Sequence, residues 1–226
     1  MTFSWCSLVI VIAALSSGRS EPVTCGSVVK LIHKETGHHL HSHPIAWGSG
    51  SGQQSITTTG SNNDAGSLWL VKEGTTSADV CEVGVPIKCG DTIRLEHVST
   101  GKKLHSHLFK APLSGNQEVS GFGGEASERG DTGDNWKVVC DLGETHWNRG
   151  SPISFAHADT NKYLFSSGTA KFTVSNCGQG CPIMGQNEVS AGVKREMKSR
   201  WETGQGVYFP SKTTVNTDIT EDDEDL

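Results

Sequence analysis

The chain of 226 residues contains three copies of one sequence repeat. The clearest copy begins at His97, reads HVSTGKKLHSH and continues to the segment GNQEVS. An earlier copy begins at His33 and a more divergent one at His157, and each copy closes at a tryptophan: Trp69, Trp136 or Trp201. A single small unit of this kind cannot bury its apolar face, so the three copies are expected to pack together as one closed domain.

The first strand predicted in each copy alternates in polarity, as a half-buried strand does. One face carries two apolar residues and a histidine in every copy: Val29, Leu31 and His33; Ile93, Leu95 and His97; Ile153, Phe155 and His157. The opposite face carries Lys30, Arg94 and Ser154, which we expect to lie in water. Thr-Gly or Thr-Asn follows each histidine and suits the positive φ of a tight hairpin turn.

Four strands are expected in each copy, which gives twelve in an all-β chain. Three such units around a pseudo-threefold axis can close a six-stranded barrel and cap it with three hairpins. The pattern therefore predicts a β-trefoil. Propellers need more repeats, and a parallel solenoid would not carry antiparallel hairpin turns.

The ends of the chain differ in composition from the repeats. Residues 1–20 hold a short apolar run followed by small residues, which predicts a cleaved signal peptide rather than a membrane span. The predicted trefoil occupies 21–210, with copies at about 25–82, 89–141 and 149–210. Residues 211–226 are predicted to be an acidic disordered tail, whose six carboxylates equal the formal net charge of −6.

Removal of the signal peptide would leave six cysteines, an even number that suggests disulfides in a secretory-pathway chain. Two pairs bracket the first and second copies, and one pair is local. We expect the bridges Cys25–Cys81, Cys89–Cys140 and Cys177–Cys181. A zinc site at Cys177 and Cys181 is the alternative, but no second close pair completes four ligands.

Four histidines stand in the paired Leu-His-Ser-His motifs: His41, His43, His105 and His107. Alternate residues of a strand face the same side, so each pair could offer imidazoles to a metal ion. The two pairs belong to separate copies, however, and zinc needs three or four converging ligands. We expect structural hydrogen bonds instead, both here and at the threefold set His33, His97 and His157, and we expect no metal.

Carbohydrate binding is the main functional alternative to a protein-contact role. Pairs of amides recur before the third strand of each copy, and amides match the hydroxyl groups of sugars: Gln53 and Gln54, Asn116 and Gln117, Gln186 and Asn187. Trp47 and Phe109 could supply the flat apolar face on which a sugar ring packs. The same amides can also fasten hairpins, which is the commoner use of buried amides.

Other function classes find little support in the residues. The chain has no Gly-x-Ser-x-Gly elbow, zincin motif or phosphate-binding glycine loop, so we expect no catalysis and no cofactor. Aromatic and basic residues are not interleaved, which disfavours nucleic acid. The acidic residues of 125–134 are expected to be solvated, and a basic cluster is a candidate contact for an acidic partner: Lys194, Arg195, Lys198 and Arg200.

The motifs also carry a family resemblance. LHSH at 40–43 and 104–107, GSGSGQQS at 48–55 and PLSGNQEVS at 112–120 resemble the MIR module of protein O-mannosyltransferases, inositol trisphosphate receptors and ryanodine receptors. CGSVVKL at 25–31 and PIKCGDTIRLEH at 86–97 are most similar to the stromal cell-derived factor 2 family.

The resemblance spans residues 23–210 and implies a lumenal protein of the endoplasmic reticulum without known catalysis. It implies that the protein acts with an Hsp70-class chaperone and its J-domain co-chaperone on unfolded client proteins, with glycans as the alternative ligand and with neither nucleic acid nor membrane as a partner. Family members commonly end in a His-Asp-Glu-Leu-like retrieval signal, whereas this chain ends in DEDL. Retrieval from later compartments is therefore an expectation, and secretion is its alternative.

Overall fold

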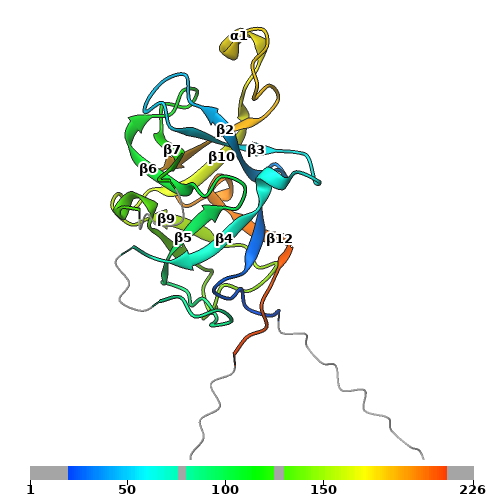
Figure 1. Ribbon diagram of the computed structural model, residues 1–226, viewed down its shortest axis with the longest axis vertical. Helices are drawn as coiled ribbons and strands as arrows, with labels where there is room; N and C mark the ends of the chain where they lie inside the picture. The colour runs from blue at the N-terminus through cyan, green and yellow to red at the C-terminus, as the bar shows by residue number, and fades with distance from the viewer. Residues whose placement is uncertain (1–19, 76–79, 125–129, 213–226) are drawn as a thin grey trace, which may run out of the picture.

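The computed structural model describes residues 20–75, 80–124 and 130–212. The predicted signal peptide, apart from Ser20, and most of the predicted acidic tail lie outside these ranges. The described residues form an all-β fold of twelve strands, the number expected from the repeats (Figure 1). Their bounds are β1 (Val28–His33), β2 (His39–Ala46), β3 (Gln54–Thr59), β4 (Trp69–Glu73), β5 (Thr92–His97), β6 (Lys103–Lys110), β7 (Gln117–Phe122), β8 (Trp136–Val139), β9 (Ser154–His157), β10 (Tyr163–Lys171), β11 (Asn187–Gly192) and β12 (Trp201–Val207).

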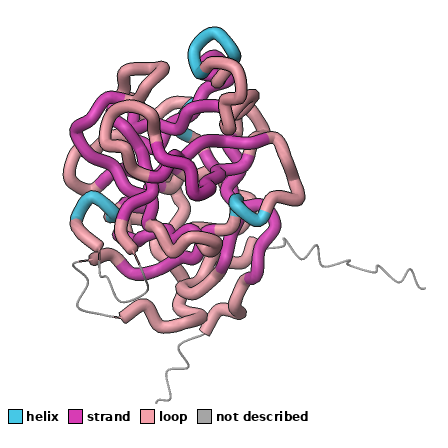
Figure 2. Tube along the Cα trace, turned by 45° about the horizontal axis from the view of Figure 1, so that its top comes forward, coloured by secondary structure: helices cyan, strands magenta, loops and turns pink. Residues whose placement is uncertain are grey.

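Helical structure in the described residues is confined to single turns. A 3₁₀ turn precedes the last strand of each copy, and one short α-helix follows β10: η1 (Ala65–Ser67), η2 (Thr132–Asp134), η3 (Met197–Ser199) and α1 (Val174–Cys177). Strands fill the centre of the molecule, and the short helix α1 lies at one end of it (Figure 1 and Figure 2). None of the described helices has the length or apolar character needed to cross a bilayer.

Strand pairing makes a closed ring of six strands. The strands β1, β4, β5, β8 and β9 pair in that order, and β12 pairs with β1. An isolated bridge between Ile153 and Trp201 joins β12 to the start of β9 and completes the ring. The other six strands form three hairpins, whose members β3, β7 and β11 pair with one another. Closure leaves the ring without a free sheet edge.

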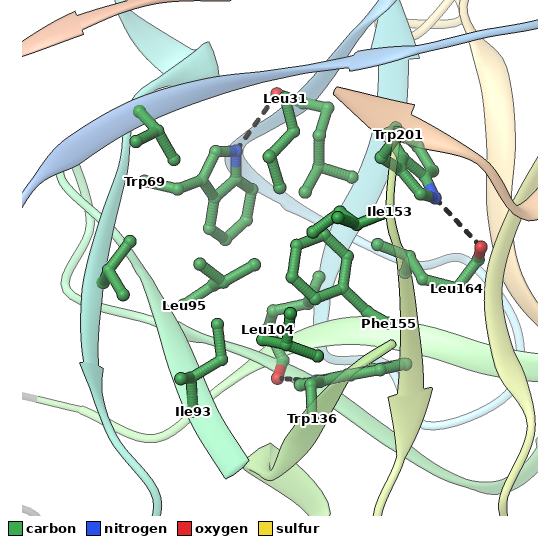
Figure 3. Close-up of a cluster of buried hydrophobic side chains, with 14 of the residues drawn as sticks. Leu31, Trp69, Ile93, Leu95, Leu104, Trp136, Ile153, Phe155, Leu164 and Trp201 are labelled. Atoms are coloured by element: carbon green, nitrogen blue, oxygen red, sulfur yellow. Dashed lines mark hydrogen bonds between the residues drawn. The ribbon is translucent and has the colours of Figure 1, made fainter. Parts of the chain in front are cut away.

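The core is built from the residues that the alternation predicted to be buried. All nine residues of the three first-strand faces are at most 1% exposed, and the leucines of the second strands are also buried: Leu40, Leu104 and Leu164. Each closing tryptophan donates a hydrogen bond from its indole nitrogen to the carbonyl of one of these leucines (Figure 3). The three distances are 3.1, 2.8 and 3.0 Å. Each copy thus satisfies its buried indole inside the core.

The turns after β1, β5 and β9 also repeat one arrangement. Gly37, Gly101 and Asn161 have φ of 69°, 67° and 54°, the left-handed conformation that the sequence predicted at these positions. The histidine before each turn contacts a threonine hydroxyl in the turn through Nδ1, at 2.8–3.0 Å. Its Nε2 contacts a backbone carbonyl of a 3₁₀ turn at 2.9–3.0 Å. The three histidines therefore fix turns and do not converge on a shared ligand.

The prediction that Lys30, Arg94 and Ser154 lie in water is wrong, since their exposures are 8%, 6% and 0%. The outer face of the six-stranded ring is covered by neighbouring segments of the chain. Lys30 donates to the carbonyl of Asn62 at 2.6 Å, and the Nε of Arg94 donates to the carbonyl of Glu73 at 2.7 Å. The alternation of polar and apolar residues shows only that one strand face is polar. It does not show whether that face is in water or is covered by other segments that supply hydrogen-bond partners.

Candidate functional site

The two histidine pairs lie on the corresponding strands β2 and β6. In the first pair, His41 is almost fully buried, and its Nε2 lies 2.8 Å from Nδ1 of His43. Its Nδ1 lies 3.3 Å from a carboxylate oxygen of Asp64, at the start of η1. Burial lowers the pKa of His41 to about 4, even though the Asp64 charge acts in the opposite direction. His41 is therefore neutral at physiological pH and packs as a structural ring.

In the second pair, His105 has a different partner. Its Nδ1 donates to Oδ1 of Asp134 at 2.9 Å, and Asp134 is completely buried. The second carboxylate oxygen of Asp134 accepts from the backbone of Asp131, while Asp131 accepts from the backbone of Gly133, so the two aspartates cap the turn η2. The expectation that the acidic residues of 125–134 are solvated is thus wrong for Asp134, because it closes a capping box. Residues 125–129 lie outside the described ranges.

The donor atoms of His105, Asp131 and Asp134 lie within 4.8 Å of one another, and these three residues are the only such set in the described part of the chain. The set has the imidazole and carboxylate groups that a divalent metal ion takes. All three side chains already have hydrogen-bond partners within the protein, which accounts for the cluster without an ion. The absence of a metal stays a prediction.

His107 joins the second copy to the loop of the first. Its Nε2 lies 3.0 Å from Oε1 of Glu118, a fully buried carboxylate on β7. The same carboxylate accepts hydrogen bonds from the backbone and hydroxyl of Ser51. Phe109 is half exposed on β6 and contacts the His107 ring edge-on, with centroids 5.0 Å apart.

The amides fasten hairpins to one another. Gln53 accepts from the hydroxyl of Ser120 at 2.5 Å, Asn116 donates to the hydroxyl of Ser190 at 3.2 Å, and Gln186 accepts from the hydroxyl of Thr57. Each of these bonds joins one copy to the third strand of another. Gln54 and Gln117 donate to the serines of their own Leu-His-Ser-His motifs, Ser42 and Ser106, at 2.7 and 2.8 Å. These bonds of buried and half-buried amides hold the hairpins together.

Trp47 cannot present a flat face to a sugar, because it is only 5% exposed. It belongs to a second apolar cluster with Phe172, Cys181 and Ile183, and its indole donates to the carbonyl of Val119 at 3.1 Å. Trp47 corresponds in strand register to Phe172 and not to Phe109. Residue type suggested a binding surface here, but the longer loop of the third copy covers the ring.

One pocket brings some of the predicted residues together. It has a volume of about 670 Å³ and lies beside β6 and η2, with Gln53, His105 and His107 in its lining. The predicted residues His41, His43, Trp47, Gln54, Phe109, Asn116 and Gln117 do not line it. The lining residues that were not predicted to bind a ligand include Leu108, Phe122, Asp131 and Asp159. Their positions in the repeat could have identified them. The pocket forms where three parts of the repeat meet: the His-Ser-His motif, the 3₁₀ turn and the hairpin turn.

The chemistry of this pocket is that of a polar recognition site. Phe122 and the His105 ring pack with centroids 4.7 Å apart and offer aromatic surface, while Asp131 and Asp159 offer carboxylate acceptors. Such a combination suits a neutral ligand with several hydroxyl groups. Two of its lining residues also form the turn contact of the third copy, in which Oγ1 of Thr160 lies 2.9 Å from Nδ1 of His157.

The cysteines are joined as the bracketing of the copies suggested: Cys25–Cys81, Cys89–Cys140 and Cys177–Cys181. The basic cluster is partly neutralised within the protein, because Arg195 and Arg200 both pair with Asp141. The two arginine contacts, with that of Arg200 as the largest effect, lower the pKa of Asp141. Only part of this cluster is therefore available to an acidic partner.

Comparison with known proteins places the chain in a family. The MIR domain family model matches residues 49–145. Stromal cell-derived factor 2 of Mus musculus is 40% identical over 207 residues, which are 92% of each chain. A stromal cell-derived factor 2-like protein of Dictyostelium discoideum is 45% identical over 193 residues, which cover 84% of this chain and 85% of the relative. These relatives are not named for a catalytic activity.

Two solved structures extend the comparison. The crystal structure of the SDF2-like protein from Arabidopsis thaliana superposes with a TM-score of 0.76 and 38% identity, covering 85% of this chain and 99% of that one. The Pmt1-Pmt2 protein O-mannosyltransferase complex of S. cerevisiae gives a TM-score of 0.68 and 26% identity, covering 86% of this chain and 27% of that one. The disulfides and these relatives together fit a protein of the secretory pathway. The chain belongs to the stromal cell-derived factor 2 family of MIR-domain proteins.

Proposed function

We propose that this protein is a non-enzymatic quality-control component of the endoplasmic reticulum that associates with an Hsp70-class chaperone and its J-domain co-chaperone on unfolded clients. The observation that carries the proposal is the extent of the family relation, which runs over 92% of both this chain and the mouse relative. A domain of this kind, with its histidines and amides engaged in internal contacts, is suited to binding other proteins through its surface.

We further propose that the fold is a β-trefoil of three MIR repeats around a pseudo-threefold axis. Four observations support this assignment. The closing tryptophans, the turn histidines and the paired amides each recur once in every copy with the same kind of partner. A closed ring of six strands with three further hairpins is the arrangement expected of a trefoil.

Affinity isolation tests the functional proposal. The tagged protein is recovered from its own cells, with and without enzymatic removal of glycans from the lysate. Recovery of a J-domain co-chaperone in stoichiometric amount, unchanged by glycan removal, is the expected result. Recovery of glycoproteins alone, and only from untreated lysate, would replace the proposal with a lectin function.

A lumenal location is part of the same proposal. Cleavage after Gly18 or Ser20 and retention through the terminal DEDL would keep the protein in the endoplasmic reticulum. N-terminal sequencing of the mature protein should find a start near Glu21. Deletion of the last four residues should raise the secreted fraction, and a fully secreted wild-type protein would instead favour the extracellular alternative.

Glycan binding is the second candidate, and the pocket beside β6 is the observation that favours it. The expected ligand is a neutral mannose-type or O-mannosyl glycan, whose hydroxyl groups match Asp131 and Asp159 and whose ring faces match Phe122. An Asp159→Asn and Phe122→Leu double variant should abolish retention on a mannose glycan array. A Val98→Ala and Leu142→Ala double variant, at exposed positions outside the pocket lining, is the matched control. Equal retention of all three proteins would exclude this pocket as a sugar site.

A further inference from the structure

A second groove lies between β10 and the loop that follows β6. Its volume is about 450 Å³, and its walls include Phe165, Leu113 and Asn116. The side chains of Lys171 and Lys198 also line it. Lys171 ends β10 and is exposed, while the ammonium of Lys198 lies 5.9 Å from the centroid of the Phe165 ring. Two cations and an aromatic surface therefore share one concave site.

Neither lysine forms an ion pair within residues 20–75, 80–124 and 130–212, and no carboxylate is part of the groove lining. The nearest buried acid in this region, Glu188, is bound by the backbone of Leu113 and Ser114 at 2.5 and 3.1 Å. Burial raises the pKa of Glu188 despite those bonds. Its carboxylate is engaged by hydrogen bonds from these two residues of the groove wall.

The groove corresponds in strand register to the pocket of the second copy. Asn116 stands in the place of Gln53, Phe165 in that of His105, and Ser167 in that of His107. Lys198 replaces Gly133 in the 3₁₀ turn. The pocket of the second copy contains the carboxylates Asp131 and Asp159, whereas the groove of the third copy contains two lysines. Corresponding sites in the second and third copies therefore carry charges of opposite sign.

We propose that this groove binds an acidic peptide segment that carries an apolar side chain beside its carboxylates. The two ammonium groups would hold the carboxylates, and Phe165 with Leu113 would contact the apolar side chain. The ladder between β10 and β11 is interrupted from Ser166 to Lys171, so backbone groups of this bulge are not committed to regular pairing. The inference goes beyond the proposed function, because it depends only on the charge and shape of this groove.

The test uses the purified protein and one synthetic probe, an acetylated and amidated hexapeptide of five aspartates around one phenylalanine. Titration calorimetry at low and at physiological ionic strength gives its dissociation constant. A Lys171→Gln and Lys198→Gln double variant should bind the probe about tenfold more weakly at low salt, as expected for the loss of charge-assisted bonds. Lys171 is exposed, Lys198 is half-buried, and neither ammonium is in an ion pair with a described residue, so the variant should keep the melting temperature of the wild-type protein.

The matched control is a Lys110→Gln and Lys137→Gln double variant, which changes the net charge equally. Lys110 holds the position in the second copy that Lys171 holds in the third. This control should keep the wild-type dissociation constant within about twofold at physiological salt, where distant charges are screened. Equal weakening in both double variants would show non-specific attraction and overturn the proposal. Binding of a heparin hexasaccharide in place of the peptide would overturn it as well.

Discussion

The loops that cap the hairpins are held in two different ways. The loops after β2 and β6 are short, and each donates hydrogen bonds to a glutamate buried on a strand of the next copy. Ser51 bonds to Glu118 in the first case, and Leu113 and Ser114 bond to Glu188 in the second. Two carboxylates that would be costly to bury alone are thereby compensated by converging donors.

The loop after β10 is longer and uses apolar contacts and a covalent bond. Cys177 and Cys181 close a small ring within it, and Phe172 and Ile183 pack against Trp47 of the first copy. The residue that corresponds to the two glutamates is Ser55, whose buried hydroxyl has no hydrogen-bond partner among the described residues. The strand framework therefore determines where each loop is attached. The contacts that attach it, hydrogen bonds to a glutamate or apolar packing with a disulfide, differ between copies.

The first prediction removes the glutamate that holds the loop after β6. Glu188→Ala leaves two backbone N–H groups without their acceptor, which should lower the free energy of unfolding by about 3 kcal/mol. Ser55→Ala is the matched control at the third junction and should change it by less than about 0.5 kcal/mol, because its hydroxyl has no partner to lose. Equilibrium urea unfolding measures both values. Equal effects in the two variants would show that the glutamate is not what holds the loop.

The second prediction removes the disulfide bond within the loop after β10. Replacing Cys177 and Cys181 by serine opens a very small ring, so the loss of unfolding free energy should be about 2 kcal/mol in the chain-entropy description. Replacing Cys89 and Cys140 opens a far longer ring and should cost about 4 kcal/mol by the same reasoning. Calorimetric melting compares the two. A larger loss at the small ring would mean that the Cys177–Cys181 bridge organises the apolar cluster around Trp47, beyond its entropic effect.

The repeats made most of the framework predictable. A strand face with two apolar residues and a final histidine, followed closely by Thr-Gly or Thr-Asn, indicated both the strand and its turn in all three copies. The closing tryptophans were visible as anchors, but their hydrogen bonds to Leu40, Leu104 and Leu164 were not, because they join strands far apart in the chain. Local pattern thus indicated the elements and the core without indicating the contacts between elements.

The candidate site was less predictable because its residues were judged by type. Trp47 and Phe109 both looked like aromatic surface, yet a loop from another copy buries the first and leaves the second half exposed. Asp134 lies in an acidic, glycine-rich stretch that resembles solvated loop, but it closes a capping box and bonds to His105. The burial of a polar residue depends on packing between segments that are far apart in the chain, and this packing cannot be read from a single sequence.

A third prediction transfers one residue from the third copy to the first. His41→Phe installs the residue that Phe165 provides at the corresponding place on β10. Since the folded pKa of His41 is about 4, the unfolded chain binds more protons below pH 6.5, and stability falls as the pH drops toward 4. From pH 8 to 5.5, His41 should account for about 1.4 kcal/mol of this loss.

The His41→Phe variant should therefore lose that much less unfolding free energy over the same pH range, measured by urea unfolding at both pH values. Asp64, His43 and His97 act on the His41 charge and remain in both proteins. The values at pH 8 serve as the reference for any change in packing. An unchanged pH slope would show that the pKa of His41 is the same in the folded and unfolded protein.

The smallest expected effect concerns the turn after β9, where the third copy has Asn161 in place of the glycines of the other two copies. Its φ of 54° strains most side chains, and asparagine tolerates it better than alanine. Asn161→Ala should cost about 1 kcal/mol of unfolding free energy, whereas Asn161→Gly should stay within about 0.5 kcal/mol of the wild-type value. Thermal unfolding of the pair separates the two outcomes. If alanine were as stable as asparagine, the turn of the third copy would not need the left-handed conformation that Gly37 and Gly101 adopt, and the three turns would differ in backbone as well as in sequence.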